Sequence, residues 1–283
     1  MKETKKKEVL YTIGEVSKIC NISKKTLRFY DSIDLISPDV VSKENGYRYY
    51  SQRTLLLVPV LKYYKQMGFR LEEIQGLLKG SNYSNMVNTF RNKLEELQKR
   101  EREIHDSRVS VNDWYRLADE ANLVRENQVK DISVKYLESV TYGWQEQDFD
   151  YSYADSIINI QWVNYLESMD AMITGPVILH YASYQDKVRG LSKRVKIMQK
   201  PIVPYKKELN VMTLENRLVI STYHIGDLAT IDERYQDLEA WAEKKGYVCA
   251  GDCFERHVID YWTTSNADDY VTEIILPIRE RID

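Results

Sequence analysis

Residues 11–38 have the sequence YTIGEVSKICNISKKTLRFYDSIDLISP, which contains the signals for two short helices near the N-terminus. Thr12 and Glu15 have the spacing of a capping box, in which the threonine hydroxyl accepts from the glutamate amide and the carboxylate accepts from the threonine amide. Ser23 caps a second short helix that is rich in lysine and arginine. Two short helices joined by a tight turn, the second of them basic, predict a helix-turn-helix.

The segment that follows supplies a second candidate contact with DNA. Residues 44–51, ENGYRYYS, place the turn dipeptide Asn45-Gly46 between two short strands, which predicts a β-hairpin wing. An arginine suits the two oxygens of a phosphate, and tyrosine hydroxyls donate to phosphate oxygens. We therefore expect DNA contacts, mostly to phosphates, from Thr12, Ser23, Lys24, Lys25, Thr26, Arg28, Tyr30, Tyr47, Arg48 and Tyr49.

Charge is unevenly distributed along the 283 residues. Residues 1–70 contain 14 lysines and arginines against 7 aspartates and glutamates, whereas the remainder contains 26 against 36. A basic segment on an acidic body favours a polyanion as partner. Lys5, Lys6 and Lys7 supply part of the excess, so a solubilising tail is the alternative explanation.

Residues 82–120 carry a heptad pattern of apolar side chains, which predicts one long helix that dimerises as a coiled coil. Glu101 and Arg108 interrupt the a positions, and in an antiparallel dimer each Glu101 can meet the partner's Arg108. The alternative is a helix that packs against its own C-terminal domain. The expected dimerisation residues are Phe90, Leu94, Leu97, Ile104 and Val111.

The C-terminal half alternates expected strands and helices in two similar halves, which predicts two βαββ-like repeats with a cleft between them. The expected first half is a strand at 132–142, a helix at 153–169 and a strand at 177–181. The expected second half is a strand at 217–224, a helix at 230–245 and strands near 253–261 and 270–277. The predicted fold class is thus α+β multidomain.

Three stretches match the DNA-binding domain of the MerR family in order and spacing, so residues 11–78 resemble that domain. The stretches are 11–38, the wing at 44–51 and KQMGFRLEEIQGLL at 65–78. The last part of the chain resembles a GyrI-like, or SOUL-type, effector-binding domain. Its motifs are YxxG at 223–226, YxxLxxW at 235–241, GY at 246–247 and DYxxEIxxPI at 269–278. The whole chain is similar to the BmrR-like, multidrug-sensing branch of the MerR family.

This resemblance implies three domains, at 1–80 (winged helix-turn-helix), 81–125 (antiparallel dimerisation helix) and 126–283 (effector-binding domain). It implies a homodimer on promoter DNA that, on binding an effector, distorts the spacer so that RNA polymerase can engage both promoter elements. No cofactor is expected. Because no apolar run approaches the roughly 18 residues of a membrane span, we expect a cytoplasmic protein without a membrane partner.

An organic cation needs aromatic faces and a carboxylate to offset its charge. By position, Glu255 and Glu273 match the acidic residues of the resembled pocket. The alternative for Glu273 is a structural carboxylate bonded to tyrosine hydroxyls, and for Glu255 a pair with Arg256 or a solvent-facing position. The expected ligand-binding residues are Glu255, Glu273, Tyr142, Trp144, Tyr181, Tyr223, Tyr261 and Trp262. We expect a small organic effector, cationic and lipophilic.

The sequence leaves three alternative functions. Metal-sensing relatives place cysteines around the dimerisation helix, where this chain has none; Cys249, Cys253 and His257 form only a weak zinc pattern. Cys253, Glu255 and His257 share one strand face, so a hydrolase with a Cys-His pair is a second alternative. A third is a DNA-binding repressor that needs no ligand. We expect no enzyme activity, no catalytic residue and no metal ligand.

Overall fold

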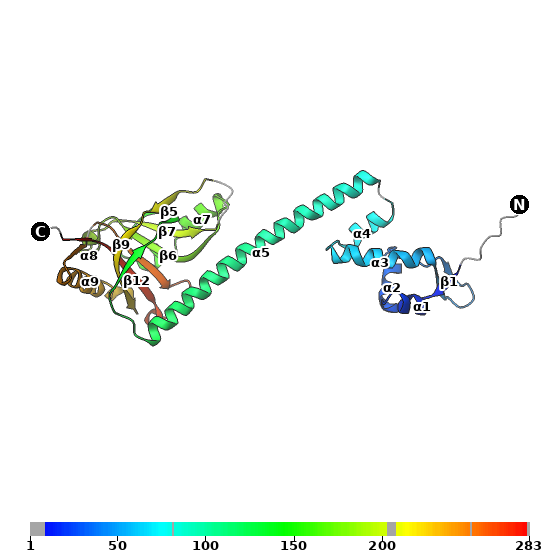
Figure 1. Ribbon diagram of the computed structural model, residues 1–283, viewed down its shortest axis with the longest axis horizontal. Helices are drawn as coiled ribbons and strands as arrows, with labels where there is room; N and C mark the ends of the chain where they lie inside the picture. The colour runs from blue at the N-terminus through cyan, green and yellow to red at the C-terminus, as the bar shows by residue number, and fades with distance from the viewer. Residues whose placement is uncertain (1–8, 81, 203–207, 250, 282–283) are drawn as a thin grey trace. The chain divides into compact units, whose positions relative to one another are not determined.

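The computed structural model describes residues 9–80, 82–202, 208–249 and 251–281. The chain divides into two compact units, Met1–Arg102 and Glu103–Asp283, and the division falls within one long helix (Figure 1). Lys5, Lys6 and Lys7 lie outside the described residues. None of the helices in the described segments is long and apolar enough to span a bilayer.

The N-terminal unit is a small winged helix-turn-helix. Its elements are β1 (Leu10–Thr12), α1 (Ile13–Ile19), α2 (Lys24–Ser32), β2 (Val40–Val41), β3 (Arg48–Ser51), α3 (Gln52–Gln66) and α4 (Leu71–Leu78). The predicted capping box at Thr12 and Glu15 is confirmed, and the Ser23 hydroxyl accepts from the Thr26 amide at 2.9 Å. The predicted wing hairpin gains a third strand, because β1 pairs with β3 to give the order β1-β3-β2.

Helix α5 (Tyr83–Glu126) is the predicted long helix, and it extends beyond the expected end at residue 120. At its start Phe90 packs edge-on against Phe69, with ring centroids 5.3 Å apart. Phe90 was expected in the dimer seam, but part of its ring surface contributes to the core of its own unit. In the single chain the other expected seam residues are exposed: Leu94, Leu97, Ile104 and Val111.

The end of α5 uses a different face. Leu117, Ala121 and Val124 are buried and form a cluster with Val258 and Val271 of the C-terminal sheet. These three helical residues are not at the a and d positions of the predicted heptads. The helix therefore packs against its own C-terminal domain along one face and leaves the heptad seam uncovered along another.

The C-terminal unit is built on one antiparallel sheet. Its strands are β4 (Ser133–Leu137), β5 (Val140–Asp148), β6 (Ile173–Tyr181), β7 (Arg194–Pro201), β8 (Val211–Leu214), β9 (Arg217–Ile225), β10 (Tyr247–Cys249), β11 (Cys253–Ile259) and β12 (Val271–Glu280). Its helices are α6 (Tyr153–Ile157), α7 (Ile160–Ser168), α8 (Tyr184–Val188), α9 (Asp232–Lys244) and the short 3₁₀ turns η1 (Leu228–Thr230) and η2 (Ala267–Asp269). The sheet order is β4-β9-β12-β11-β6-β7-β5-β8, with β10 beside β12.

The strand order supports the predicted pair of repeats. The run β9-β12-β11 on one side mirrors the run β5-β7-β6 on the other, and β11 pairs with β6 at the centre. Two expectations are corrected: the strand expected at 132–142 is two strands, β4 and β5, and the helix expected at 153–169 is two helices. The helix breaks because the Asn159 side chain caps α7 by accepting from the Trp162 amide at 2.7 Å.

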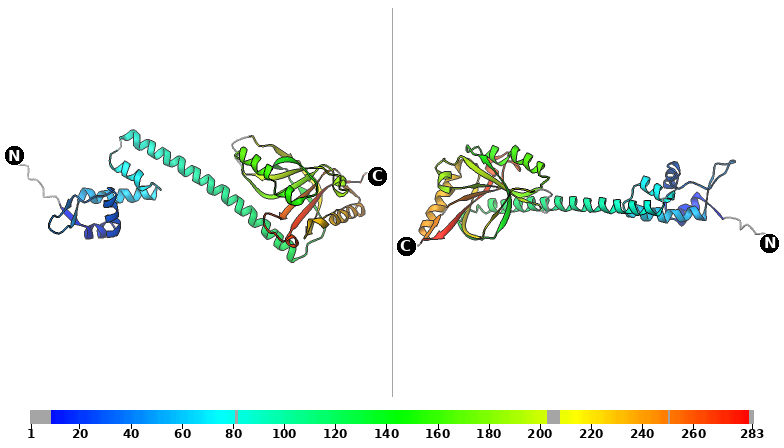
Figure 2. Two further views of the ribbon diagram at one scale, coloured as in Figure 1. Left: turned by 180° about the vertical axis from the view of Figure 1, so that it is seen from behind. Right: turned by 90° about the horizontal axis from the view of Figure 1, so that it is seen from above.

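The sheet curls, as both views of Figure 2 show, and its two faces are covered by different layers. On one face α7 and α9 contribute Trp162, Tyr235 and Leu238 to the main core. On the other face lie a smaller cluster around Phe254 and the end of α5. These two faces separate the candidate site residues.

Candidate functional site

Glu255 and Glu273 lie on opposite faces of the sheet. Side chains alternate along β11, so Glu255 and Arg256 face opposite ways. The register pairs Arg256 with Glu273 of β12, which puts Glu273 on the Arg256 side. The expectation that both carboxylates match the acidic residues of one pocket is therefore corrected.

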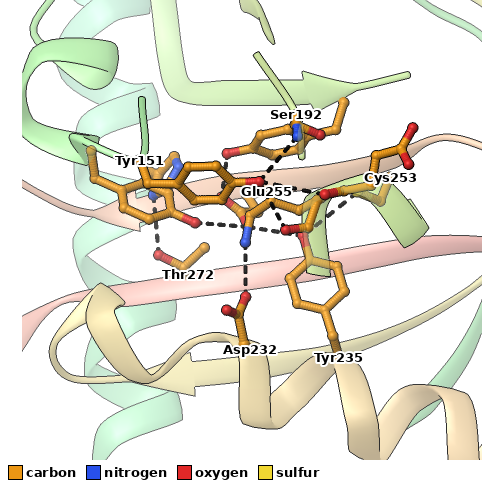
Figure 3. Close-up of polar contacts among 12 residues, drawn as sticks. Tyr151, Ser192, Asp232, Tyr235, Cys253, Glu255 and Thr272 are labelled. Carbon is orange, nitrogen blue, oxygen red and sulfur yellow. Dashed lines mark hydrogen bonds and ion pairs between the residues drawn. The ribbon is translucent and has the colours of Figure 1, made fainter. Parts of the chain in front are cut away.

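Glu255 is fully buried, and its carboxylate accepts hydrogen bonds from three tyrosine hydroxyls (Figure 3). Tyr235 of α9 donates to Oε1 at 2.8 Å, Tyr181 of β6 donates to Oε2 at 2.9 Å, and Tyr153 of α6 donates to Oε1 at 3.2 Å. Burial, followed by the charge of Glu255, raises the pKa of Tyr153 and Tyr181 well above the usual value, so both stay protonated donors. We call Glu255, the three tyrosines that donate to it and the lysine described next the Glu255 cage.

A lysine from α8 completes the cage. The Nζ of Lys187 lies 3.6 Å from Glu255 Oε1 and 2.9 Å from Asp232 Oδ1. It also lies over four tyrosine rings, 5.0 Å from the centroid of Tyr235 and 5.5 to 5.9 Å from those of Tyr151, Tyr181 and Tyr153. Burial lowers the pKa of Lys187, but Glu255 and Asp232 together outweigh it and hold the pKa above the usual value.

A cleft of about 360 Å³ opens at this cage, between the two halves of the domain. The first half contributes Tyr151, Tyr153 and Lys187 to its lining, and the second half contributes Asp232 and Tyr261. The Tyr151 hydroxyl donates to the Lys187 carbonyl at 3.0 Å and accepts from the Ser192 amide at 3.2 Å, so it fixes the segment that carries the lysine (Figure 3). The arrangement joins a buried carboxylate, aromatic faces and an entrance.

The expected ligand residues divide between the two faces. Tyr181 is in the Glu255 cage, Tyr261 lines the cleft, and Trp262 is half exposed with its Nε1 donating to the Ile157 carbonyl at 3.3 Å. The opposite face holds Glu273, Tyr142, Trp144 and Tyr223. These four were expected at the ligand site, but the strand register places them away from Glu255.

On that opposite face, polar residues form a network between the sheet and α5. Arg256 donates to Glu273 through Nε at 2.8 Å and to Glu120 of α5 through both terminal nitrogens. Tyr223 donates to Glu120 at 2.7 Å, and Lys135 pairs with Glu273. From the sequence, tyrosine hydroxyls were the alternative partners expected for Glu273, and Arg256 was an alternative partner expected for Glu255. In the structure the reverse holds: Glu255 accepts from tyrosines, and Glu273 pairs with Arg256.

Sequence reasoning missed five members of the site: Tyr151, Tyr153, Lys187, Asp232 and Tyr235. Two signals pointed toward them. The chain has 22 tyrosines and only 5 phenylalanines, an excess suited to rings that also donate hydrogen bonds. Tyr235 also opens the YxxLxxW motif. Nothing local in the sequence distinguishes Lys187 from the many surface lysines.

The geometry also bears on the alternative chemistries. Burial raises the pKa of the Cys253 thiol and lowers the pKa of His257 to about 3, so the thiol is not activated and the imidazole is neutral. His257 Nδ1 faces the Thr272 hydroxyl at 3.1 Å. Across the described part of the chain, no three histidine, cysteine, aspartate or glutamate side chains gather closely enough to hold a metal ion.

The expected DNA-binding residues are mostly on the surface of the N-terminal unit. Lys24, Lys25 and Arg28 are exposed on α2, and Tyr47 is exposed at the wing. Tyr30 is corrected, because it is buried in the core and is 3% exposed. The Nε of Arg48 donates to Asp31 at 2.7 Å, so one edge of its guanidinium is already occupied. Thr12 and Ser23 act as helix caps, and Thr26 and Tyr49 are half-buried.

The two units define a class: a winged helix-turn-helix protein with an attached ligand-binding domain. Comparison with known protein families supports the same two-part class. Residues 131–279 match the GyrI-like small molecule binding domain, and residues 11–81 match the MerR HTH family regulatory protein. The chain belongs to the GyrI-like small molecule binding domain family and carries a MerR-type regulatory domain in front of it.

Individual relatives match either nearly the whole chain or its N-terminal part alone. The chain is 25% identical over 280 residues to the multidrug-efflux transporter 2 regulator of Bacillus subtilis, which covers 95% of this chain and 97% of that protein. It is 46% identical over 69 residues to the multidrug-efflux transporter 1 regulator of the same organism, covering 24% and 25%. Among solved structures, the EcmrR chain of an EcmrR–DNA complex matches with 20% identity and a TM-score of 0.47, covering 96% of this chain and all of that one.

Proposed function

We propose that this protein is a ligand-responsive transcription activator whose effector, a small lipophilic organic cation, binds at the Glu255 cage. The observation that carries the proposal is a buried carboxylate, surrounded by tyrosine donors and rings, next to a cleft between two halves of a small molecule binding domain; Tyr153 and Lys187 both contact this carboxylate and line the cleft. Aromatic faces and a carboxylate are the groups that recognise such a cation.

We assign DNA binding to residues 1–80, dimerisation to 81–125 and effector binding to 126–283. The exposed basic residues of α2 and the wing contact mainly phosphates, and the dimer reads two half-sites of a promoter. Effector binding distorts the promoter spacer so that RNA polymerase engages it. Because its promoter DNA is in the bacterial cytoplasm, we place the protein there. The regulators of multidrug-efflux transporters among its relatives support an effector of this kind.

No enzyme activity is proposed. A cysteine nucleophile needs a low thiol pKa and a base oriented toward it. Cys253 has a raised pKa and accepts its hydrogen bond from the Tyr235 hydroxyl at 3.6 Å, while His257 faces Thr272. A hydrolase would reveal itself as ester turnover that the Cys253→Ala substitution abolishes.

The test is the Glu255→Gln substitution with Glu273→Gln as its matched control. Glutamine keeps the shape of the side chain but removes the charge that offsets the cation, so Glu255→Gln weakens binding of phenyltrimethylammonium about tenfold or more. Glu273 lies on the other face, so Glu273→Gln leaves this affinity unchanged. Calorimetry with the full-length protein measures both.

In-vitro transcription from the protein's own promoter, with a panel of cationic dyes and drugs, then separates binding from activation. The Glu255→Gln protein needs higher effector concentrations for the same transcript level. Equal affinity in the two variants would remove Glu255 from the site. A transcript level that does not change when any of these cations is bound would favour the alternative of a ligand-independent repressor.

A further inference from the structure

The Glu255 cage already contains a cation. Every feature that suits it to an organic cation, a buried carboxylate and surrounding tyrosine rings, is directed at the ammonium of Lys187. This lysine is 1% exposed, and lysine is almost never buried to that degree unless it is paired. An external cation of the same chemistry therefore competes with a group of the chain itself.

We propose that Lys187 is a tethered internal cation that occupies the effector position of the Glu255 cage and is displaced by a cationic effector. The inference rests on the proposed function, because it concerns the same site. It assigns Lys187 a specificity-determining role: the lysine sets how strongly a compound must interact with the cage before it binds.

Displacement is feasible because Lys187 has a second acceptor. Its Nζ is closer to Asp232 Oδ1, at 2.9 Å, than to Glu255 Oε1, at 3.6 Å. Asp232 begins α9 at the cleft and its side chain is 49% exposed, whereas Glu255 is fully buried. The ammonium can therefore leave Glu255 toward the cleft while it keeps its hydrogen bond to Asp232.

This exchange keeps every charge paired. Before binding, Glu255 is offset by Lys187; after binding, Glu255 is offset by the effector cation and Lys187 by Asp232. A neutral compound that displaced the lysine would leave the buried carboxylate without a counter-charge, which is strongly unfavourable. The cage thus rejects neutral compounds even where their shape fits.

The lysine also lowers the affinity for cations. When a site is available for only a fraction of the time, the apparent dissociation constant rises by the inverse of that fraction. A lysine that holds the cage for nine-tenths of the time or more raises it about tenfold or more. Removing the charge of Lys187 removes this competition.

The experiment uses the full-length protein with Lys187→Gln and, as matched control, Lys187→Arg. Glutamine can still donate a hydrogen bond in the cage but carries no charge, whereas arginine keeps the charge. Calorimetry with phenyltrimethylammonium should give about tenfold or more tighter binding for Lys187→Gln and no gain for Lys187→Arg. The neutral compound of the same shape, tert-butylbenzene, should not show the tenfold gain in Lys187→Gln.

The outcomes separate this inference from the proposed function. If the unmodified protein binds the cation through Glu255 but Lys187→Gln binds it no more tightly, the displacement proposal is overturned and the function stands. If only Lys187→Gln binds the cation, the cation does not displace Lys187 in the unmodified protein, and both the displacement proposal and the effector role of the unmodified cage are overturned. If no variant binds the cation, both are overturned.

A measurement on the unmodified protein guards against a variant that fails to fold. With ¹³Cε-labelled lysine, the four surrounding rings shift the NMR signal of Lys187 away from those of surface lysines. The signal is assigned by its loss in Lys187→Arg, or otherwise by its ring-shifted position. Saturation with phenyltrimethylammonium should move it toward the surface-lysine position. A signal that stays in place while the cation binds would overturn displacement.

Discussion

At the scale of single residues, the chain holds several ionisable groups away from water, and each has a different consequence. Lys187 and Glu255 compensate one another's charge. Asp260, in the turn after β11, is also buried, but no cation pairs with it among the described residues, and its Oδ1 accepts only from the Trp262 amide at 2.9 Å. Burial therefore raises the pKa of Asp260 to about 6.

This raised pKa predicts a pH-dependent stability. Between about pH 4 and pH 6 the folded protein holds a proton on Asp260 that the unfolded chain has lost, so the free energy of unfolding falls as pH rises through that range. Asp260→Asn keeps the acceptor and removes the titration. We expect the variant to be about 2–3 kcal/mol more stable relative to the unmodified protein at pH 7 than at pH 4.

Urea unfolding of both proteins at the two pH values measures this difference. Asp252→Asn is the contrasting control, because the pKa of Asp252 is lowered by its hydrogen bond to His180 and by Arg217, which together outweigh its burial. The ionised Asp252 carboxylate therefore raises the free energy of unfolding, and this contribution is lost as pH falls. A stability difference between Asp260→Asn and the unmodified protein that does not change with pH would contradict the prediction.

At the scale of elements, β11 connects the two faces of the sheet. Glu255 faces the cage and its neighbour Arg256 faces α5, where it donates to Glu120 through both terminal nitrogens. A change at the cage that shifts β11 therefore also shifts the contact between Arg256 and Glu120 of α5, the helix that is continuous in sequence with the N-terminal unit. Fork-shaped pairs of this kind are geometrically specific, so a small displacement weakens them.

Glu120→Gln tests this connection. The amide keeps the shape but loses the charge, so we expect the free energy of unfolding to fall by about 1–2 kcal/mol, after allowance for the partial exposure of the pair. Because Glu120 is on the other side of the sheet from the cage, cation affinity should be nearly unchanged while the transcriptional response falls. Asp119→Asn, the adjacent carboxylate, should alter neither. A full response in Glu120→Gln would show that the pair does not transmit the signal.

At the scale of the whole molecule, an uncovered apolar seam follows α5. Leu94, Leu97, Ile104 and Val111 are each at least 41% exposed in the single chain, although the same helix buries Leu117, Ala121 and Val124 on its own sheet. Regularly spaced apolar residues on an otherwise charged helix are covered by a second helix in a coiled coil. The uncovered seam thus fits the homodimer that promoter binding needs.

Ile104→Lys places a charge in the middle of this seam. We expect the variant to sediment as a monomer at micromolar concentration, because a lysine pair at the centre of an apolar seam is unfavourable. Loss of the second half-site contact should weaken operator binding about a hundredfold or more. Glu95→Lys, which adds a lysine away from the a and d positions, should remain dimeric. A dimeric Ile104→Lys protein would exclude this seam as the interface.

Parts of the chain whose structure depends on nearby residues could be predicted from the sequence. The caps at Thr12 and Ser23, the positive φ of Gly46 in the loop between β2 and β3, and the long helix α5 depend on positions a few residues apart, and all of these local features are present in the structure. The broad plan of the C-terminal domain also followed from alternating strands and helices, although the breaks within 132–142 and 153–169 did not.

Which residues gather around Glu255 depends on contacts between segments that are far apart in the sequence. The register between β11 and β12 separates Glu255 from Glu273, and a shift of one residue would have reversed the facing of a strand. Lys187 reaches Glu255 because the order β11-β6-β7 brings α8 beside the centre of the sheet. A buried charge acquires its partner through such long-range packing, and no local pattern of residues encodes that partner.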